Sequence, residues 1–173
     1  MFVKIGSTKE PSDIVDLLLE CHERIRTFAG IARRLGDARN VSQDEIREAA
    51  ACVLRYFSES LPLHVADEEE SILPRLSGRE PELDAALQSM HREHEEHTAP
   101  LARLLEICRA LQDSPGRLDE VRESLASVAA ALERDFLFHL EKEERIILPA
   151  IRSHLSGAER ETMLQELRAR RNN

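Results

Sequence analysis

Aromatic residues and glycine are scarce in this sequence, and their scarcity narrows the fold class. The 173 residues include no Trp, one Tyr and five Phe, with only six Gly and seven Pro. A β-sandwich needs aromatic strands and frequent turns, whereas long helices need neither. Hydrophobic residues make up 42% of the chain and charged residues 33%, and a chain of this length can bury a sizeable core. The composition therefore predicts an all-α protein that forms a single domain over residues 1–173.

Basic clusters, long apolar runs and paired cysteines are also missing. A net charge of -9 without a concentrated positive surface argues against nucleic acid or an anionic membrane as a partner. No apolar run approaches the roughly 18 residues that span a bilayer, so we expect a cytoplasmic protein. The three cysteines, Cys21, Cys52 and Cys108, are far apart and form no CxxC pair. This pattern predicts reduced thiols in helix packing rather than a disulfide framework.

The chain contains a repeat with an offset of 75 residues. "HVADEEESILP" begins at His64 and "HLEKEERIILP" begins at His139. In each copy a glutamate, Glu68 or Glu143, stands four residues after the histidine and is followed by a second Glu, an aliphatic pair and a proline. The apolar positions before the two histidines repeat at the same offset. The sequence is therefore predicted to be a duplicated helical hairpin.

Apolar residues at the three-and-four spacing of a helix face predict four long helices. The stretch "GDARN" ends the first, and Ser42 with Glu45 has the spacing of a capping box at the start of the second. Two hairpins bury four apolar stripes most simply as an antiparallel up-down four-helix bundle, here over about 12–151. A short fifth helix is predicted over about 156–171.

Each predicted helix carries one histidine on its apolar face, and two helices add a glutamate. These residues are His22, His64, Glu68, His94, His139 and Glu143. A single histidine on an apolar face is usually a core residue, but two buried carboxylates without compensation would each cost several kcal/mol. Imidazole and carboxylate together suit iron, manganese or zinc, and this set has more ligands than one ion normally takes. The pattern therefore indicates two metal ions that share the two glutamates.

Several other polar residues lie close to these positions. Asp135, one turn before His139, is expected either to accept the free ring N–H of a ligand histidine or to reach water at the edge of the stripe. His97 lies about 60° from His94 around the third helix, and it is expected to be either a fifth histidine ligand or a group beside the centre, with the second favoured. A strict offset of 75 would instead pair His22 with His97. The remaining acidic residues, Asp67, Glu69, Glu70, Glu141 and Glu144, are predicted to form solvated faces, and His91 and His154 are predicted to be exposed.

The arrangement of these motifs resembles the hemerythrin-like, or HHE cation-binding, family over about residues 12–151. That family has a histidine on the first helix, HxxxE on the second, a histidine in an "EH" context on the third and HxxxE on the fourth. "MHREHEEH" and "ERDFLFHLEKEERIILP" look like its third and fourth helices. The resemblance implies a non-haem centre of two iron ions with an oxo or hydroxo bridge. Carried over by position, the ligands are His22, His64, Glu68, His94, His139 and Glu143.

The resemblance also implies a range of functions. Such a centre binds or reacts with O2, NO or peroxide, which suits oxygen sensing or storage, NO-stress defence or peroxide turnover. The alternatives are an iron donor for repair of iron-sulfur clusters, and a structural or interaction bundle whose site holds zinc or stays empty. The sequence identifies no redox partner, and it leaves open whether the protein is an enzyme.

Overall fold

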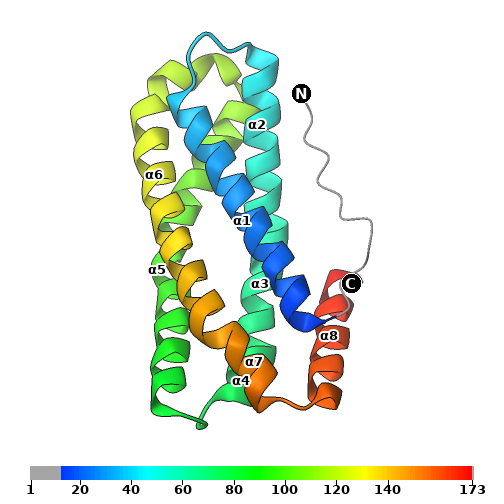
Figure 1. Cartoon of the computed structure of the whole chain (residues 1–173). Helices are drawn as coiled ribbons and strands as arrows, with labels where there is room; N and C mark the ends of the chain where they lie inside the picture. Colours follow the sequence, from blue (N-terminus) through cyan, green and yellow to red (C-terminus); the bar gives the residue numbers. More distant parts are fainter. Residues whose placement is uncertain (1–12, 173) are drawn as a thin grey trace.

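The computed structural model describes residues 13–172, and every regular element in that range is a helix (Figure 1). Three elements, η1, η2 and η4, are π-helical turns, and η3 is a 3₁₀ turn. The elements in chain order are α1 (Ile14–Asp37), α2 (Gln43–Arg55), η1 (Tyr56–Ser60), α3 (Leu61–Ala66), η2 (Asp67–Ile72), α4 (Leu73–Leu76), α5 (Pro81–Asp113), η3 (Pro115–Arg117), α6 (Leu118–Lys142), η4 (Glu143–Ile147), α7 (Leu148–His154) and α8 (Gly157–Asn172).

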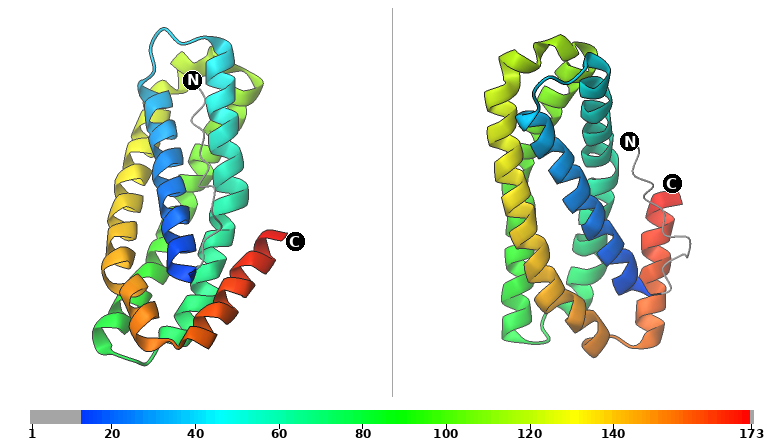
Figure 2. Two further views of the ribbon diagram at one scale, coloured as in Figure 1. Left: turned by 45° about the vertical axis from the view of Figure 1, so that its right-hand side comes forward. Right: turned by 45° about the horizontal axis from the view of Figure 1, so that its top comes forward.

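These elements form four antiparallel arms. The first arm is α1, the second runs continuously from α2 to α4, the third is α5, and the fourth runs from α6 to α7 (Figure 1). Helix α1 packs against α2 and α6, and α5 packs against the same two helices from the opposite side. The predicted antiparallel up-down four-helix bundle is confirmed. The predicted fifth helix is α8, which lies outside the bundle against η2 and α1 (Figure 2).

The helix starts follow from local sequence chemistry. The side chain of Asp13 accepts a 2.8 Å hydrogen bond from the backbone N–H of Val15 and so caps α1. The predicted capping box is present, because Ser42 accepts from the backbone N–H of Glu45 while the Glu45 carboxylate accepts from that of Ser42. Within residues 13–172, no helix combines the length and the apolar character needed to cross a membrane.

The apolar core consists of two clusters, with a band of buried polar residues between them. On α1, Leu18 belongs to one cluster and Ile25 to the other, and the fully buried His22 lies between the two in sequence. On the fourth arm, the buried polar residues His139 and Glu143 lie where the two apolar clusters meet. The bundle therefore encloses a polar layer partway along its length, shielded by apolar side chains on both sides.

Candidate metal centre

A π-helical turn precedes the repeated proline on both the second and the fourth arm, η2 and η4. Leu73, which directly precedes a proline, donates its N–H to the carbonyl of Glu68 five residues back, and Leu148 makes the same contact with Glu143. A proline has no N–H, and its ring crowds the carbonyl four residues earlier. The preceding turn therefore widens to the five-residue spacing, as π-helical turns often do at functional sites. In each widened turn, the closing hydrogen bond is accepted by the backbone carbonyl of the residue that carries the inward carboxylate, Glu68 or Glu143.

The six polar residues on the inner faces form two groups that share both glutamates. The first group is His22, His64, Glu68 and Glu143, and the second is Glu68, His94, His139 and Glu143. Within each group, the candidate ligand atoms lie within 4.8 Å of one another. Each carboxylate directs one oxygen towards each group. The contacts are Glu68 Oε1 to His64 Nε2 (3.1 Å), Glu68 Oε2 to His94 Nε2 (3.1 Å), Glu143 Oε1 to His139 Nε2 (3.0 Å) and Glu143 Oε2 to His22 Nε2 (3.3 Å).

These atoms fit a pair of cations. Six of the candidate ligand atoms are buried and have no hydrogen-bond partner within residues 13–172. These atoms are His22 Nε2, His64 Nε2, Glu68 Oε2, His94 Nε2 and both carboxylate oxygens of Glu143. Buried polar atoms are rarely left unpaired, because each costs free energy of desolvation. Two donor atoms at metal-bonding distance from one ion and at right angles to each other are about 3 Å apart. The N···O contacts of 3.0–3.3 Å match this spacing.

Three of the four histidines are held from behind by a carboxylate on Nδ1. The contacts are His22 to Glu144 (2.8 Å), His94 to Glu69 (2.7 Å) and His139 to Glu93 (2.7 Å). A carboxylate in this position keeps the proton on Nδ1, fixes the ring orientation and leaves Nε2 free to bind a metal. Cations support two of these carboxylates, since Arg26 donates to Glu144 and Lys142 contacts Glu93.

The sequence predictions for these supporting residues were wrong in several places. Glu69 and Glu144 were expected on solvated faces, but each follows a shared glutamate in a π-helical turn and reaches a histidine. Asp67 was also expected in solvent, but its side chain is completely buried and pairs with arginines of α8. Glu70 and Glu141 are exposed, as predicted.

Glu93, and not Asp135, is the carboxylate that contacts the ring Nδ1 of His139. Asp135 lies at the edge of α6, where its carboxylate is 43% exposed and accepts from Arg134. Glu93 reaches His139 across the bundle from α5, 46 residues away in sequence. Periodicity along one helix does not predict this contact, although Glu93 stands directly before His94 in the sequence.

His97 lies beside the cluster rather than in either candidate ligand group. Its side chain is buried, with its ring centroid 4.9 Å from that of Phe136 and 5.6 Å from that of His139. Burial and the neighbouring His139 and His94 lower the pKa of His97 to about 4, so the ring is neutral at pH 7. The third helix is therefore oriented with His94 towards the shared glutamates.

The two other histidines differ in exposure. His91 is exposed, as predicted, and its Nδ1 contacts Glu69 at 2.8 Å. His154, predicted to be exposed, is partly buried and lies 3.2 Å from Glu80.

Without bound cations, protonated histidines balance the charge of the cluster. Burial acts to lower the pKa of His139, but Glu143 and Glu93 outweigh it and raise this pKa to about 10. Burial and Glu68 oppose each other in the same way at His64, whose pKa lies well above its ordinary value. Burial acts to raise the pKa of Glu68, but His64 and other neighbouring imidazoles hold it well below the ordinary value.

The fold and the cluster define a helical bundle with a buried His/Glu site able to hold metal cations. A comparison with protein families gives the same assignment: the family described as "Hemerythrin HHE cation binding domain" matches residues 13–105, which is more than half of the chain. The chain therefore belongs to the hemerythrin HHE cation-binding family. The matched segment contains His22, His64, Glu68 and His94, while His139 and Glu143 lie in the repeated segment beyond it. Among curated proteins no match was found.

Proposed function

We propose that this protein is a non-haem di-iron protein that binds or reacts with O2, NO or peroxide. The observation that carries the proposal is the pair of ligand groups, in which each position has two imidazoles and both share the same two carboxylates. Imidazole and carboxylate donors without thiolate suit iron or manganese as well as zinc. Family membership supports cation binding, and the choice of iron is the proposal.

The spacing of the donor atoms supports cation binding at both positions. The N···O contacts of 3.0–3.3 Å match the separation of two ligands on one ion. One ion would be held by His22, His64, Glu68 and Glu143, and the other by Glu68, His94, His139 and Glu143.

The chain itself supplies geometry and a dry environment. The carboxylates of Glu69, Glu93 and Glu144 orient three imidazoles, and the apolar clusters on both sides separate the centre from water. His97 places a neutral, buried imidazole beside His139. When bound, ferrous ions with nitrogen and oxygen ligands supply the capacity to bind O2 or NO and to exchange electrons.

Iron analysis of the purified protein tests this proposal. Protein expressed with iron should contain about two iron atoms per chain and show near-ultraviolet absorption of oxo-bridged ferric iron. His94→Ala should lose iron, and His154→Ala is the control, because His154 belongs to neither ligand group and pairs with Glu80. Titration with azide and NO then tests whether small ligands bind. A well-folded protein with stoichiometric zinc and no iron would overturn the proposal and favour a structural bundle.

A further inference from the structure

Glu69 joins a ligand histidine of the centre to an exposed histidine on the same helix. Its Oε1 lies 2.7 Å from Nδ1 of His94, and its Oε2 lies 2.8 Å from Nδ1 of His91. Because a carboxylate has only acceptor oxygens, each ring donates its Nδ1–H to Glu69. The side chains are 9%, 24% and 55% exposed in the order His94, Glu69, His91. A hydrogen-bonded chain therefore runs from the candidate metal centre to the surface of α5.

The other two supporting carboxylates are paired with cations instead. Arg26 donates to Glu144, and Lys142 contacts Glu93. At the third carboxylate, the exposed imidazole takes this place. Each carboxylate behind a ligand histidine is therefore held by a donor of its own, and the donor is of a different kind in this one case.

The internal repeat provides a comparison for His91. Glu69 and Glu144 are equivalent, since each directly follows a shared glutamate. Aligning α1 and α5 on their ligand histidines puts Leu19 opposite His91, three residues before the ligand in each case. Leu19 with Glu144, and His91 with Glu69, line two surface hollows of about 440 Å³ each. The two places have the same construction, so a leucine at the place of His91 is compatible with the fold.

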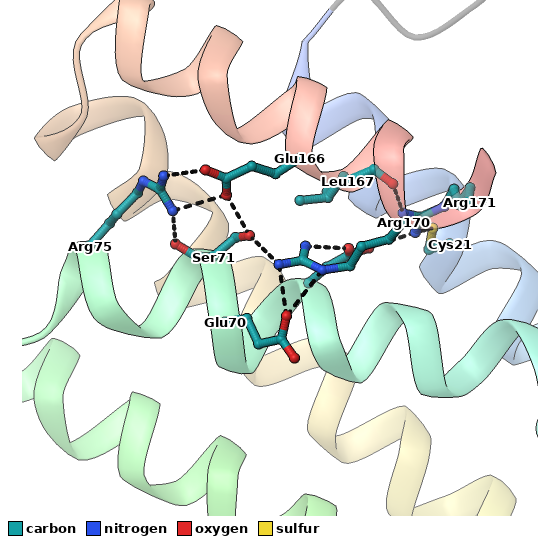
Figure 3. Close-up of polar contacts among 9 residues, drawn as sticks. Cys21, Glu70, Ser71, Arg75, Glu166, Leu167, Arg170 and Arg171 are labelled. Atoms are coloured by element: carbon teal, nitrogen blue, oxygen red, sulfur yellow. Dashed lines mark hydrogen bonds and ion pairs between the residues drawn. The ribbon is translucent and has the colours of Figure 1, made fainter. Parts of the chain in front are cut away.

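The turn that carries Glu69 is also held by α8, at other residues (Figure 3). Arg170 donates to Glu70 at 3.1 Å and to Ser71 at 2.9 Å. These contacts fix the η2 turn without His91. A change at His91 should therefore act on the Glu69 side chain and leave the turn in place.

We propose that His91 is a positioning residue for His94, acting through Glu69, and that it thereby slows release of the cation that His94 holds. With both oxygens engaged, Glu69 has one orientation and keeps the His94 proton on Nδ1, which leaves Nε2 free for the cation. Loss of a supporting group behind a ligand histidine typically weakens metal binding about 10- to 100-fold. Because Glu69 would keep its contact with His94, removal of His91 should lie at the lower end of this range. The inference rests on the cation binding in the proposed function and not on the choice of iron.

The test loads each protein with zinc, which stays in one oxidation state, and measures the rate of its extraction by a chelator. His91→Leu, which introduces the leucine of the equivalent place on α1, and His91→Ala both remove the donor. Both should release zinc about tenfold faster than wild type. His91→Asn should restore slow release, because its side-chain amide donates from about the position of Nδ1. Gln88→Leu is the matched control, because Gln88 is exposed and lines the same hollow about one turn earlier.

The ring signals of His94 give a readout that general loosening of the bundle would not reproduce. In metal-free protein, the ¹⁵N NMR signals of the His94 ring should shift in His91→Leu and return towards those of wild type in His91→Asn. The signals of the His22 ring should stay unchanged, because Glu144 supports that ring. Melting of the metal-free proteins shows that each variant is folded.

Three results would overturn the inference. They are unchanged zinc release in His91→Leu and His91→Ala, release from His91→Asn as fast as from His91→Leu, and equally fast release from the control Gln88→Leu. All three leave the proposed function intact. A wild type that binds zinc but no iron would overturn the proposed function and leave this inference open to the same test, whereas a wild type that binds neither metal would overturn both.

Discussion

Cation binding by this protein should release protons, because histidines that would act as metal ligands are protonated in the metal-free protein. The pKa of His139 is raised to about 10 by Glu143 and Glu93 acting against burial, and that of His64 is raised well above its ordinary value of 6.5. The ring of His139 is therefore protonated at pH 8 in the metal-free protein, and the raised pKa of His64 favours its protonated form as well. An imidazole binds a metal only when it is neutral, so binding must displace these protons.

The size of the effect follows from the number of protons. Displacing the His139 proton makes the apparent affinity rise about tenfold for each pH unit between pH 7 and 9, and any proton displaced from His64 adds to this rise. The rise should flatten as the pH approaches the His139 pKa of about 10. For His97 no such release is expected, because its pKa of about 4 leaves it neutral at pH 8.

The same pKa shifts set the pH dependence of metal-free stability. The raised pKa of His139 contributes stability that is complete below 6.5 and is lost as the pH rises through about 10. The lowered pKa of Glu68 contributes stability that is present above its ordinary value of 4.5 and is lost as the pH falls through the folded-state pKa. The gap between the melting temperatures of loaded and metal-free protein should therefore widen from pH 7 to pH 10.

Isothermal titration calorimetry in two buffers of different ionisation enthalpy measures the released protons directly. Zinc is a suitable probe because it does not oxidise, and at least one proton per chain is expected at pH 8. His97→Gln serves as the control and should leave the proton count unchanged. A count of zero would refute the reasoning, since it would mean that the histidines are neutral before the cation arrives.

The remaining predictions concern a supporting carboxylate and the packing of α1. Glu93→Gln removes the charge behind His139 and should weaken retention of one cation about 10- to 100-fold in a chelator competition, without loss of the other. Gly36→Ala should destabilise the fold by about 1–3 kcal/mol in thermal unfolding, because its Cβ would lie 2.8 Å from the backbone Cα of Ala126 on α6. Gly30→Ala should instead gain up to about 1 kcal/mol from helix propensity, since the nearest atom, at 3.3 Å, belongs to a flexible arginine side chain. Reversed signs for this pair would contradict the packing described for α1 and α6.

The helices and the inward residues were predictable because they depend on periodicity within single segments. A histidine and a glutamate four residues apart share a helix face in any helix, so the sequence alone placed His64 with Glu68 and His139 with Glu143. The 75-residue repeat then required two equivalent hairpins, and burying their apolar stripes required the bundle. The capping box at Ser42 and the fifth helix are similarly local, and both are present.

The groups that support the histidines were decided only by the tertiary structure. Glu93, Glu69 and Glu144 reach histidines that lie 46, 25 and 122 residues away in sequence, on other helices. Whether a carboxylate at the edge of a helix meets water or an imidazole depends on the rotation and separation of neighbouring helices, which periodicity along one helix does not specify. Asp67 is the clearest case: its local sequence is that of a solvated acidic face, but α8 folds back from more than 100 residues away and covers it with two arginines.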